Sequence, residues 1–122
     1  FFVIWNSENE KIMAKELKSL STKINIIDKL SLDELISFIS QMSLIIGSDT
    51  GPTHMAWSLN IPSITLFGPT PGYRNTFETD FNKYIESNSI VNPLNINKND
   101  HSIKDIELED IVKMTRYLLK VV

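Results

Sequence analysis

The sequence predicts an α/β fold built on a doubly wound parallel sheet, and two observations lead to that prediction. First, the short apolar runs 1–5, 43–47 and 63–68 read as buried strands. Second, segments with an apolar face at helical spacing alternate with these runs, so the order is strand, helix, strand, helix, strand, helix, strand. Continuous apolar strands that alternate with helices indicate a parallel sheet covered by helices on both faces.

The first part of the chain carries clear helix-start signals between its strands. Ser7 and Glu10 have the spacing of a capping box, and Ser31 and Glu34 repeat that spacing. Each pair precedes a segment with an apolar stripe on one helical face. Strands are therefore expected at 1–5, 23–28 and 43–47, and helices at 8–20 and from Leu32 to near Met42.

The second part of the chain continues the alternation after strand 43–47. Pro52 suits the first turn of a helix, where its missing N–H is not needed, and this helix is expected to run to about Leu59 and end at Asn60. The remaining elements are expected at 63–68 for a strand, 69–76 for a turn-rich loop, near 85–91 for one more strand, 93–105 for an irregular polar segment and 108–119 for the closing helix.

Length, composition and charge limit the classes of protein to which this chain can belong. The 122 residues suffice for one domain, and the apolar fraction of 42% and charged fraction of 22% are those of a globular chain. A net charge of −3 argues against a general nucleic-acid binder. The absence of cysteine excludes disulfides and thiolate metal sites, and two distant histidines make a zinc site improbable.

Targeting signals are also absent from the sequence as read. No apolar run approaches the roughly 20 residues of a membrane span, and the first ten residues lack the basic region and cleavage site of a signal peptide. The chain does not begin with methionine and opens directly on a strand-like run. We therefore expect it to be a fragment that begins at a domain boundary of a longer protein.

The stretch "GSDTGPTHMAW", residues 47–57, has two interpretations that predict different folds. Asp-Thr-Gly after an apolar strand could be half of an aspartic-protease dyad, but such proteases are all-β and use a glycine-rich flap. Here the stretch leads into a helix, and the chain contains only four glycines. The second interpretation, a loop that carries a strand into a helix and holds an anion there, fits the alternating elements.

Each residue type in this loop suits anion binding. The first N–H groups of the helix, expected from about Thr53 and His54, lack intrahelical partners and add to the helix dipole. Gly51 would let the backbone approach a ligand closely, and the hydroxyls of Thr50 and Thr53 would add donors. His54 can donate to an oxyanion. Asp49 would instead accept from a sugar hydroxyl or a backbone N–H, because a carboxylate repels phosphate.

Structural roles for the same residues remain open alternatives. Asp49 or Thr50 could simply cap the helix, and Gly51 could serve only the turn. His54 could be a surface histidine with no ligand.

The stretch "SDTGPTHMAWSLNIPSITLFGPTPG" resembles the signature of glycosyltransferase family 9, the lipopolysaccharide heptosyltransferases of Gram-negative bacteria. That family carries Asp-Thr-Gly, then His, a small-residue helix, and an apolar strand ending in Phe/Tyr-Gly-Pro-Thr. The resemblance also includes "IWNSENE" and "LSLDELISFISQMSLIIGSDTG", so it spans most of residues 1–92. The loop "PTPGYRNTF" is most similar to that of heptosyltransferase I.

The resemblance implies a GT-B enzyme with two Rossmann-like domains. Residues 1–122 would form a single nucleotide-sugar-binding domain, the C-terminal one, less its first strand. It would hold ADP-L-glycero-D-manno-heptose, while the missing N-terminal domain would supply the Kdo-lipid A acceptor site and the catalytic base. Catalytic residues are thus expected outside this chain. The transfer would be inverting and independent of metals and cofactors. The alternative is a non-catalytic nucleotide-binding module of the same fold.

The family also implies a location for the protein. A cytoplasmic enzyme is expected, and its lipid-borne acceptor leaves peripheral association with the inner face of the cytoplasmic membrane open.

The resemblance assigns roles residue by residue. Asp49, Thr50, Gly51 and His54 match the signature and would lie at the diphosphate and heptose. Pro52 occupies a variable position, so only its backbone would matter.

Further positions match the family outside the loop. Glu10 matches an acidic residue that holds the adenosine ribose, with the capping box as its alternative role. Leu30 matches an apolar residue against adenine, with ordinary packing as its alternative. Gly68, Pro69 and Thr70 would shape the cleft floor, and Tyr73 and Arg74 would lie on the acceptor side or at the surface.

Overall fold

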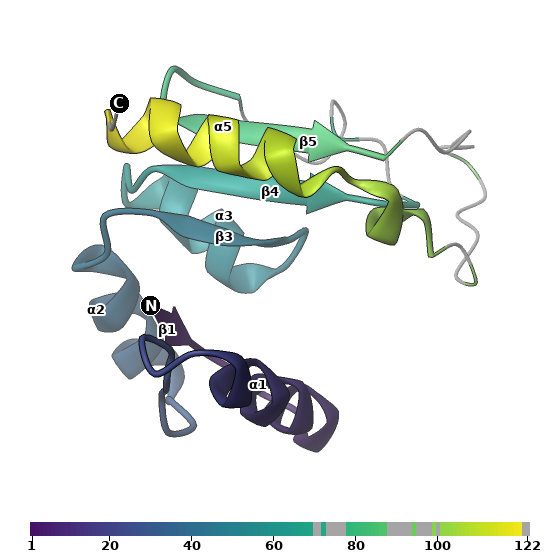
Figure 1. Ribbon diagram of the computed structural model, residues 1–122. Coiled ribbons are helices and arrows are strands. Elements are labelled where there is room, and N and C mark those ends of the chain that lie inside the picture. Colours follow the sequence, from purple (N-terminus) through teal and green to yellow (C-terminus); the bar gives the residue numbers. More distant parts are fainter. Residues whose placement is uncertain (70–71, 73–77, 88–93, 95–98, 100, 121–122) are drawn as a thin grey trace. The chain divides into compact units, whose positions relative to one another are not determined.

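The structure is a computed structural model that describes residues 1–69, 72, 78–87, 94, 99 and 101–120 (Figure 1). These residues form two compact units, 1–35 and 36–122. Each unit contains parallel strands and helices, so the α/β class predicted from the sequence is confirmed. The all-β aspartic protease is therefore the wrong interpretation of the Asp-Thr-Gly stretch.

Unit 1 pairs two short parallel strands beside one long helix. Strand β1 (Phe2–Val3) runs parallel to β2 (Asn25–Ile26), and helix α1 (Glu8–Leu20) connects them. Helix α1 has the predicted bounds, and both halves of its capping box form. The strands are shorter than the predicted 1–5 and 23–28. Beyond the ladder the two segments are joined by a side-chain hydrogen bond, which the Trp5 indole N–H donates to the Ile27 carbonyl at 2.8 Å.

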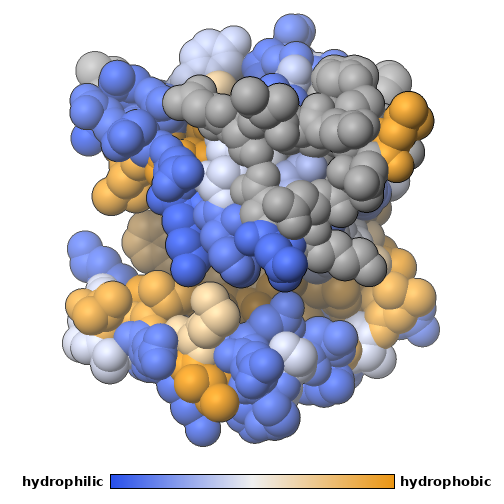
Figure 2. Space-filling model, turned by 90° about the vertical axis from the view of Figure 1, so that its right-hand side faces the viewer, coloured by the Kyte–Doolittle hydropathy of each residue, from blue (hydrophilic) through white to orange (hydrophobic). Residues whose placement is uncertain are grey.

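Several large apolar side chains of unit 1 are exposed to solvent. Side chains at both ends of this unit's strands and helix are more than half exposed, among them Phe1, Phe2, Ile12, Met13 and Leu20. Figure 2, which shows one face of the molecule, has orange hydrophobic residues beside blue hydrophilic ones. The two-stranded ladder of this unit is therefore too small to bury its own apolar residues.

Helix α2 (Leu32–Ser40) contains the boundary between the two units. Its start follows the prediction, because Ser31 and Glu34 exchange the hydrogen bonds of a capping box. Its end comes two residues before the predicted Met42. The N–H groups of Gln41 and Met42 bond carbonyls three residues back, which tightens the last turn and ends the α-helical pattern.

Unit 2 contains a three-stranded parallel sheet in the order β3-β4-β5. Its strands are β3 (Ile45–Ser48), β4 (Ser63–Phe67) and β5 (Asn82–Glu86), and its α-helices include α3 (Gly51–Ser58) and α5 (Leu108–Leu119). The expectations for β4, α3 and α5 agree with the structure to within one residue at each end. Strand β3 begins two residues later than expected, because Ile45 is where the ladder with Ser63 starts.

Strand β5 lies earlier in the chain than the predicted 85–91, so that prediction was wrong in position. Part of the predicted range, 88–91, falls outside the described residues. The strand starts at Asn82, which is 2% exposed, and the sequence-based expectation missed it because this residue is polar. Its carboxamide nitrogen donates to the Ile61 carbonyl and to the Ser63 hydroxyl, and Thr79 donates to its carboxamide oxygen at 3.0 Å. A fully bonded amide can be buried without the cost of an unpaired polar group.

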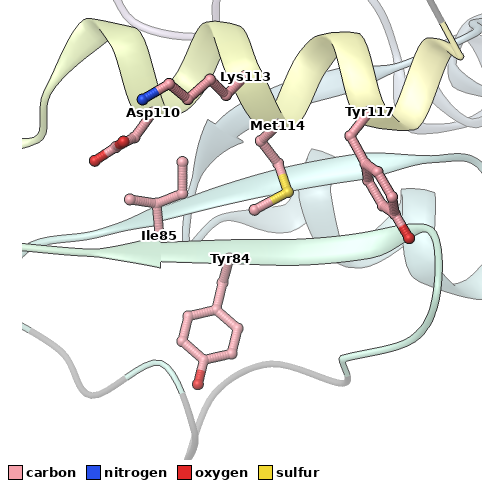
Figure 3. Close-up of a pocket in the computed structure, with 6 residues that line it drawn as sticks. All are labelled: Tyr84, Ile85, Asp110, Lys113, Met114 and Tyr117. Carbon is pink, nitrogen blue, oxygen red and sulfur yellow. The ribbon is translucent and has the colours of Figure 1, made fainter.

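Helices α3 and α5 cover opposite faces of the three-stranded sheet. A methyl group at Gly47 would lie 3.2 Å from Thr53 on α3, so Gly47 and its register partners Thr65 and Tyr84 face that helix. Successive strand residues point to opposite faces, and Ile85 accordingly points toward α5 (Figure 3). Figure 1 shows α5 in front of the sheet and α3 behind it. The predicted covering of both faces is confirmed for this sheet.

The end of α3 is fixed by a left-handed residue. Asn60 has φ 56°, its N–H donates to Trp57, and the Ile61 N–H donates to Ala56. These bonds form a Schellman motif, in which Asn60 takes the position that glycine usually occupies. The sequence-based end of the helix at Asn60 is therefore confirmed with its geometry.

One short element was not expected. The 3₁₀ turn η1 (Ser102–Asp105) lies in the segment predicted to be irregular. It is held against the end of β4, because the hydroxyls of Ser87 and Ser102 are 2.8 Å apart and Ser87 also donates to the Gly68 carbonyl. The missing side chain of Gly68 makes room for Ile103 of this turn.

Candidate functional site

The loop between β3 and α3 lies at the carboxyl end of β3, the strand at one side of the order β3-β4-β5. Strand β3 ends at Ser48, and Thr50 is the N-cap of α3 in an extended conformation with φ −141° and ψ 171°. Thr53 is 1% exposed, and its hydroxyl lies 2.9 Å from the Ser48 carbonyl and 2.8 Å from the Thr50 carbonyl. This hydroxyl therefore fastens the loop from its buried side. In this conformation it cannot also serve as the outward donor that the sequence suggested.

The main-chain donors at the start of α3 differ by one residue from those expected. The His54 N–H donates to the Thr50 carbonyl at 3.2 Å, so it belongs to the helical ladder and is not a first-turn donor. The expectation was off because the helix begins at Gly51, one residue earlier than assumed. The first-turn N–H groups outside the helical ladder are thus those of Gly51 and Thr53, since Pro52 has no N–H, and the N–H of Thr53 faces the Thr50 side chain as in a capping box.

The His54 side chain pairs with the Asp49 carboxylate across the helix start. Nε2 of His54 lies 2.7 Å from Oδ1 of Asp49, and the two side chains are 49% and 24% exposed. The His54 ring also stacks on Trp57, one turn along α3, with centroids 4.4 Å apart and planes 23° apart. An anion at this helix start would meet an exposed imidazole whose position two neighbours define.

Gly51 has no role that the fold itself requires. Its φ is not positive, and an added methyl group would meet nothing closer than Met55 at 4.0 Å. A turn that needs a left-handed residue would not explain this glycine. The open space over Gly51 leaves the helix start accessible to a ligand.

The two remaining sequence-predicted site residues belong to unit 1, whereas the loop 49–54 belongs to unit 2. Glu10 is exposed, and its Oε2 accepts from the N–H groups of Asn6 and Ser7 at 2.8 and 2.9 Å. The N–H of Ser7, followed by that of Asn6, holds the pKa of the Glu10 carboxyl below its usual value. Leu30 is half-buried in the segment between β2 and α2.

The second part of the predicted signature follows β4. Gly68 is buried and packs against Ile103 of η1, and Pro69 is half-buried. The predicted residues Thr70, Tyr73 and Arg74 lie outside the described residues.

The clearest hollow in unit 2 lies away from this loop. It has a volume of about 420 Å³ between β5 and α5. Figure 3 shows Ile85 and Met114 directed toward one another across it, while Tyr84 points to the other side of β5. The lining is mostly apolar, and its charged members Asp110 and Lys113 both come from α5. We regard this hollow as a gap in helix–sheet packing, because its lining charges come from one helix alone, whereas in ligand sites polar groups converge from several elements.

Two further observations concern the described residues as a whole. They contain no group of three His, Cys, Asp or Glu side chains that could hold a metal ion. Within the same ranges, no helix has the length and apolar character that crossing a membrane requires.

Comparison with known proteins places this loop in a family. The family described as "Glycosyltransferase family 9 (heptosyltransferase)" matches residues 1–105 of this chain. The matched residues include Glu10, Leu30 and the whole β3–α3 loop. The chain belongs to glycosyltransferase family 9. The resemblance inferred from the Asp-Thr-Gly signature is therefore confirmed, together with the GT-B-like fold class of this family.

Curated relatives carry one function in their names. A Lipopolysaccharide heptosyltransferase 1 of Campylobacter coli is 47% identical over 122 aligned residues, which cover 96% of this chain and 36% of that protein. Proteins of the same name from Salmonella typhimurium and Pseudomonas aeruginosa are 32% and 30% identical and match 56% and 60% of this chain. The chain thus spans about a third of the Campylobacter relative. No solved structure matches it.

Sequence reasoning missed one residue of the site, Trp57. Its signal was present, because residues three apart on a helix are neighbours, and Trp57 follows His54 at that spacing. The pairing of Asp49 with His54 was also missed, since it depends on the path of the loop rather than on a helical repeat.

Proposed function

We propose that this chain is the donor-binding part of a heptosyltransferase that moves L-glycero-D-manno-heptose from ADP-heptose to Kdo of the lipopolysaccharide inner core. One observation carries the proposal: the Asp49–His54 pair stands at the start of α3, directly after a parallel strand, inside the segment that matches the family. A helix start at the carboxyl end of such a strand attracts phosphate groups. The shared name of the curated relatives supports the choice of sugar.

The donor would be held by groups of both kinds, main chain and side chain. Its diphosphate would accept from the first-turn N–H groups of Gly51 and Thr53 and from the His54 imidazole, with the Thr50 hydroxyl beside them. Pro52 would contribute only its fixed backbone. Asp49 would hold His54 and lie near the heptose hydroxyls, where a carboxylate is a good acceptor.

Two residues of unit 1 would recognise the nucleoside. Glu10 would accept from the ribose hydroxyls through Oε1, because Oε2 is occupied by the capping box. Leu30 is half-buried and would present an apolar side chain to adenine. Residues 1–122 would thus act as one nucleotide-sugar-binding domain.

The reaction would be a direct displacement with inversion at the heptose anomeric carbon. A base outside this chain would take the proton of a Kdo hydroxyl, whose oxygen forms the new bond while the bond to the ADP oxygen breaks. The role of this chain would be electrostatic, because the helix start and His54 would stabilise the charge that develops on departing ADP. The chemistry proposed for these residues requires no metal. The enzyme would work in the cytoplasm, with its lipid-borne acceptor at the inner face of the cytoplasmic membrane.

Calorimetric titration with ADP tests the proposal, with UDP as the base-specificity control. His54→Ala should weaken ADP binding about tenfold or more, since a hydrogen bond to a charged group is worth about 1.5–3 kcal/mol. His101→Ala is the matched control, because His101 is the other histidine of the chain and is exposed at the start of η1. Equal affinity for wild type and His54→Ala would move the phosphates away from this loop.

Two further results would decide between this proposal and the non-catalytic alternative. The titration is repeated on the longer protein that contains this chain, and absence of ADP binding in both would refute the donor site. Heptosyl transfer by the longer protein is then measured with ADP-heptose and a Kdo acceptor. ADP binding that depends on His54 without any transfer would favour the nucleotide-binding module.

A further inference from the structure

Three side chains meet at the start of α3 and form one contact group, Asp49, His54 and Trp57. The carboxylate of Asp49 lies 2.7 Å from Nε2 at the edge of the imidazole, and the indole of Trp57 covers one of its faces at 4.4 Å between centroids. The two contacts restrict different motions of the His54 side chain. A stacked neighbour fixes the plane of the ring, and an edge partner fixes which nitrogen points which way.

The edge contact determines the protonation pattern of the neutral ring. A carboxylate is only an acceptor when ionised, so the 2.7 Å contact requires the hydrogen on Nε2. The second ring nitrogen, Nδ1, then carries no hydrogen in the neutral ring, and it becomes a donor only when the ring takes up a second proton beside the Asp49 carboxylate. A neutral imidazole in solution exchanges between two tautomers, whereas this arrangement selects one of them.

The indole contributes its ring face and not its hydrogen bond. Among the described residues, the buried Nε1–H of Trp57 has no acceptor. A buried donor without a partner disfavours the folded state, so the hydrogen-bonding capacity of this residue gives no reason for its presence. What the structure uses is the aromatic surface, since His54 is about half exposed and would otherwise sample several rotamers.

We propose that Asp49 and Trp57 are positioning residues that hold the His54 imidazole ready for the ligand, with Nδ1 as the nitrogen that takes up a proton and donates it to the anion when the ligand binds. The identity of that anion as a nucleoside diphosphate rests on the function proposed above, whereas the positioning itself does not. Ordering the ring before binding removes a cost that the ligand would otherwise have to offset. The expected consequence is a tighter complex with no additional contact to the ligand.

The first test needs no nucleotide. Long-range ¹H–¹⁵N NMR of the histidine rings reports their tautomers, and the chain offers His101 as an internal reference because it contains only two histidines. Wild-type His54 should show the Nε2–H form alone and ring-proton shifts displaced by the indole, whereas His101 should show mixed tautomers and no displacement. Trp57→Leu should abolish the displacement, and Asp49→Ala should return His54 to the mixed tautomers of a free imidazole. Unchanged His54 signals in either folded variant would overturn the proposal.

A conservative variant separates stacking from general support of the fold. Trp57→Phe keeps an aromatic face and removes the unpaired N–H, so it should retain both the shift displacement and the tautomer of His54. If Trp57→Leu does not fold, Trp57→Phe and Asp49→Ala still carry the test. Loss of the ring-proton displacement in Trp57→Phe, with the fold intact, would contradict the role assigned to the ring face.

Addition of ADP distinguishes this inference from the proposed function. Binding should shift the Nδ1 resonance of His54 more than that of Nε2, and Trp57→Leu should lower ADP affinity about three- to tenfold while Trp57→Phe stays near wild type. A larger shift at Nε2 would overturn the assignment of Nδ1. A held ring with no ADP binding in any form of the protein would instead refute the donor site and leave the positioning intact.

Discussion

Replacement of Gly68 by alanine would place a methyl group where the chain has no space for one. The added Cβ would lie 2.9 Å from Cβ of Ile103, 3.0 Å from its backbone nitrogen and 3.4 Å from its Cα. Two of these atoms belong to the backbone of η1, so no side-chain rotation relieves the contact. Overpacking of this kind costs about 1–3 kcal/mol. Because the Ser87–Ser102 contact holds η1 in place, relief of the clash would also shift the end of β4.

Gly51→Ala is a matched control that isolates this cost. Both substitutions reduce the freedom of the unfolded chain by a similar amount, about 0.4–1 kcal/mol in favour of folding. The new methyl group at Gly51 meets nothing closer than 4.0 Å. The difference in free energy of unfolding between the two variants should therefore be about 1–3 kcal/mol, measured by urea unfolding with unchanged m-values. Equal stabilities would refute the close approach of η1 to β4.

Three other predictions concern the helix starts and ends. Gly51→Ala, although neutral or slightly stabilising for the fold, should weaken ADP binding about fivefold or more in calorimetry, because its methyl group occupies the open space at the proposed site. Glu10→Gln should lower the thermal midpoint at pH 7, and this effect should shrink as the solution is acidified. The folded-state pKa of Glu10 is lowered, so its contribution is present above the ordinary carboxyl pKa and is lost as pH falls through the lowered one. Glu16→Gln on the same helix is the control for the change in charge. The backbone at Asn60 is left-handed with φ 56°. Asn60→Gly should therefore raise the free energy of unfolding of unit 2 by about 0.5–1 kcal/mol, and Asn60→Ala should lower it by a similar amount, in denaturant unfolding. Equal stabilities of the two variants would contradict that geometry.

The parts of the fold that the sequence predicted well are those whose signals are local. Helix α1 was placed to the residue because its capping box, Ser7 with Glu10, lies within four positions of the helix start. The end of α3 at Asn60 was likewise a local signal. Strand β5 was misplaced because its first residue, Asn82, is buried through bonds to residues about twenty positions earlier. The sequence around Asn82 contains no signal that predicts its bonds to Ile61 and Ser63.

The site shows the same division between local and non-local information. Residue types at 49–54 led to the prediction of an anion-binding loop, which stays a prediction, and the stack of Trp57 on His54 follows from helical spacing. The pairing of Asp49 with His54 was not predictable, since it depends on the extended backbone of Thr50 at the turn between strand and helix. The inward hydroxyl of Thr53 was also hidden, because burial of a polar side chain is known only once its acceptors are in place.

The bonds of Asn82 have a consequence for misfolding. A slip of β5 by one residue along β4 would exchange the faces of Tyr84 and Ile85, and hydrophobicity alone would resist this weakly because both side chains are largely apolar. The slipped register would also separate Asn82 from the Ser63 hydroxyl and the Ile61 carbonyl and leave a buried amide without partners. One polar residue thus makes alternative strand pairings selectively unstable, so the chain is protected from a trap that its apolar residues could not exclude by themselves.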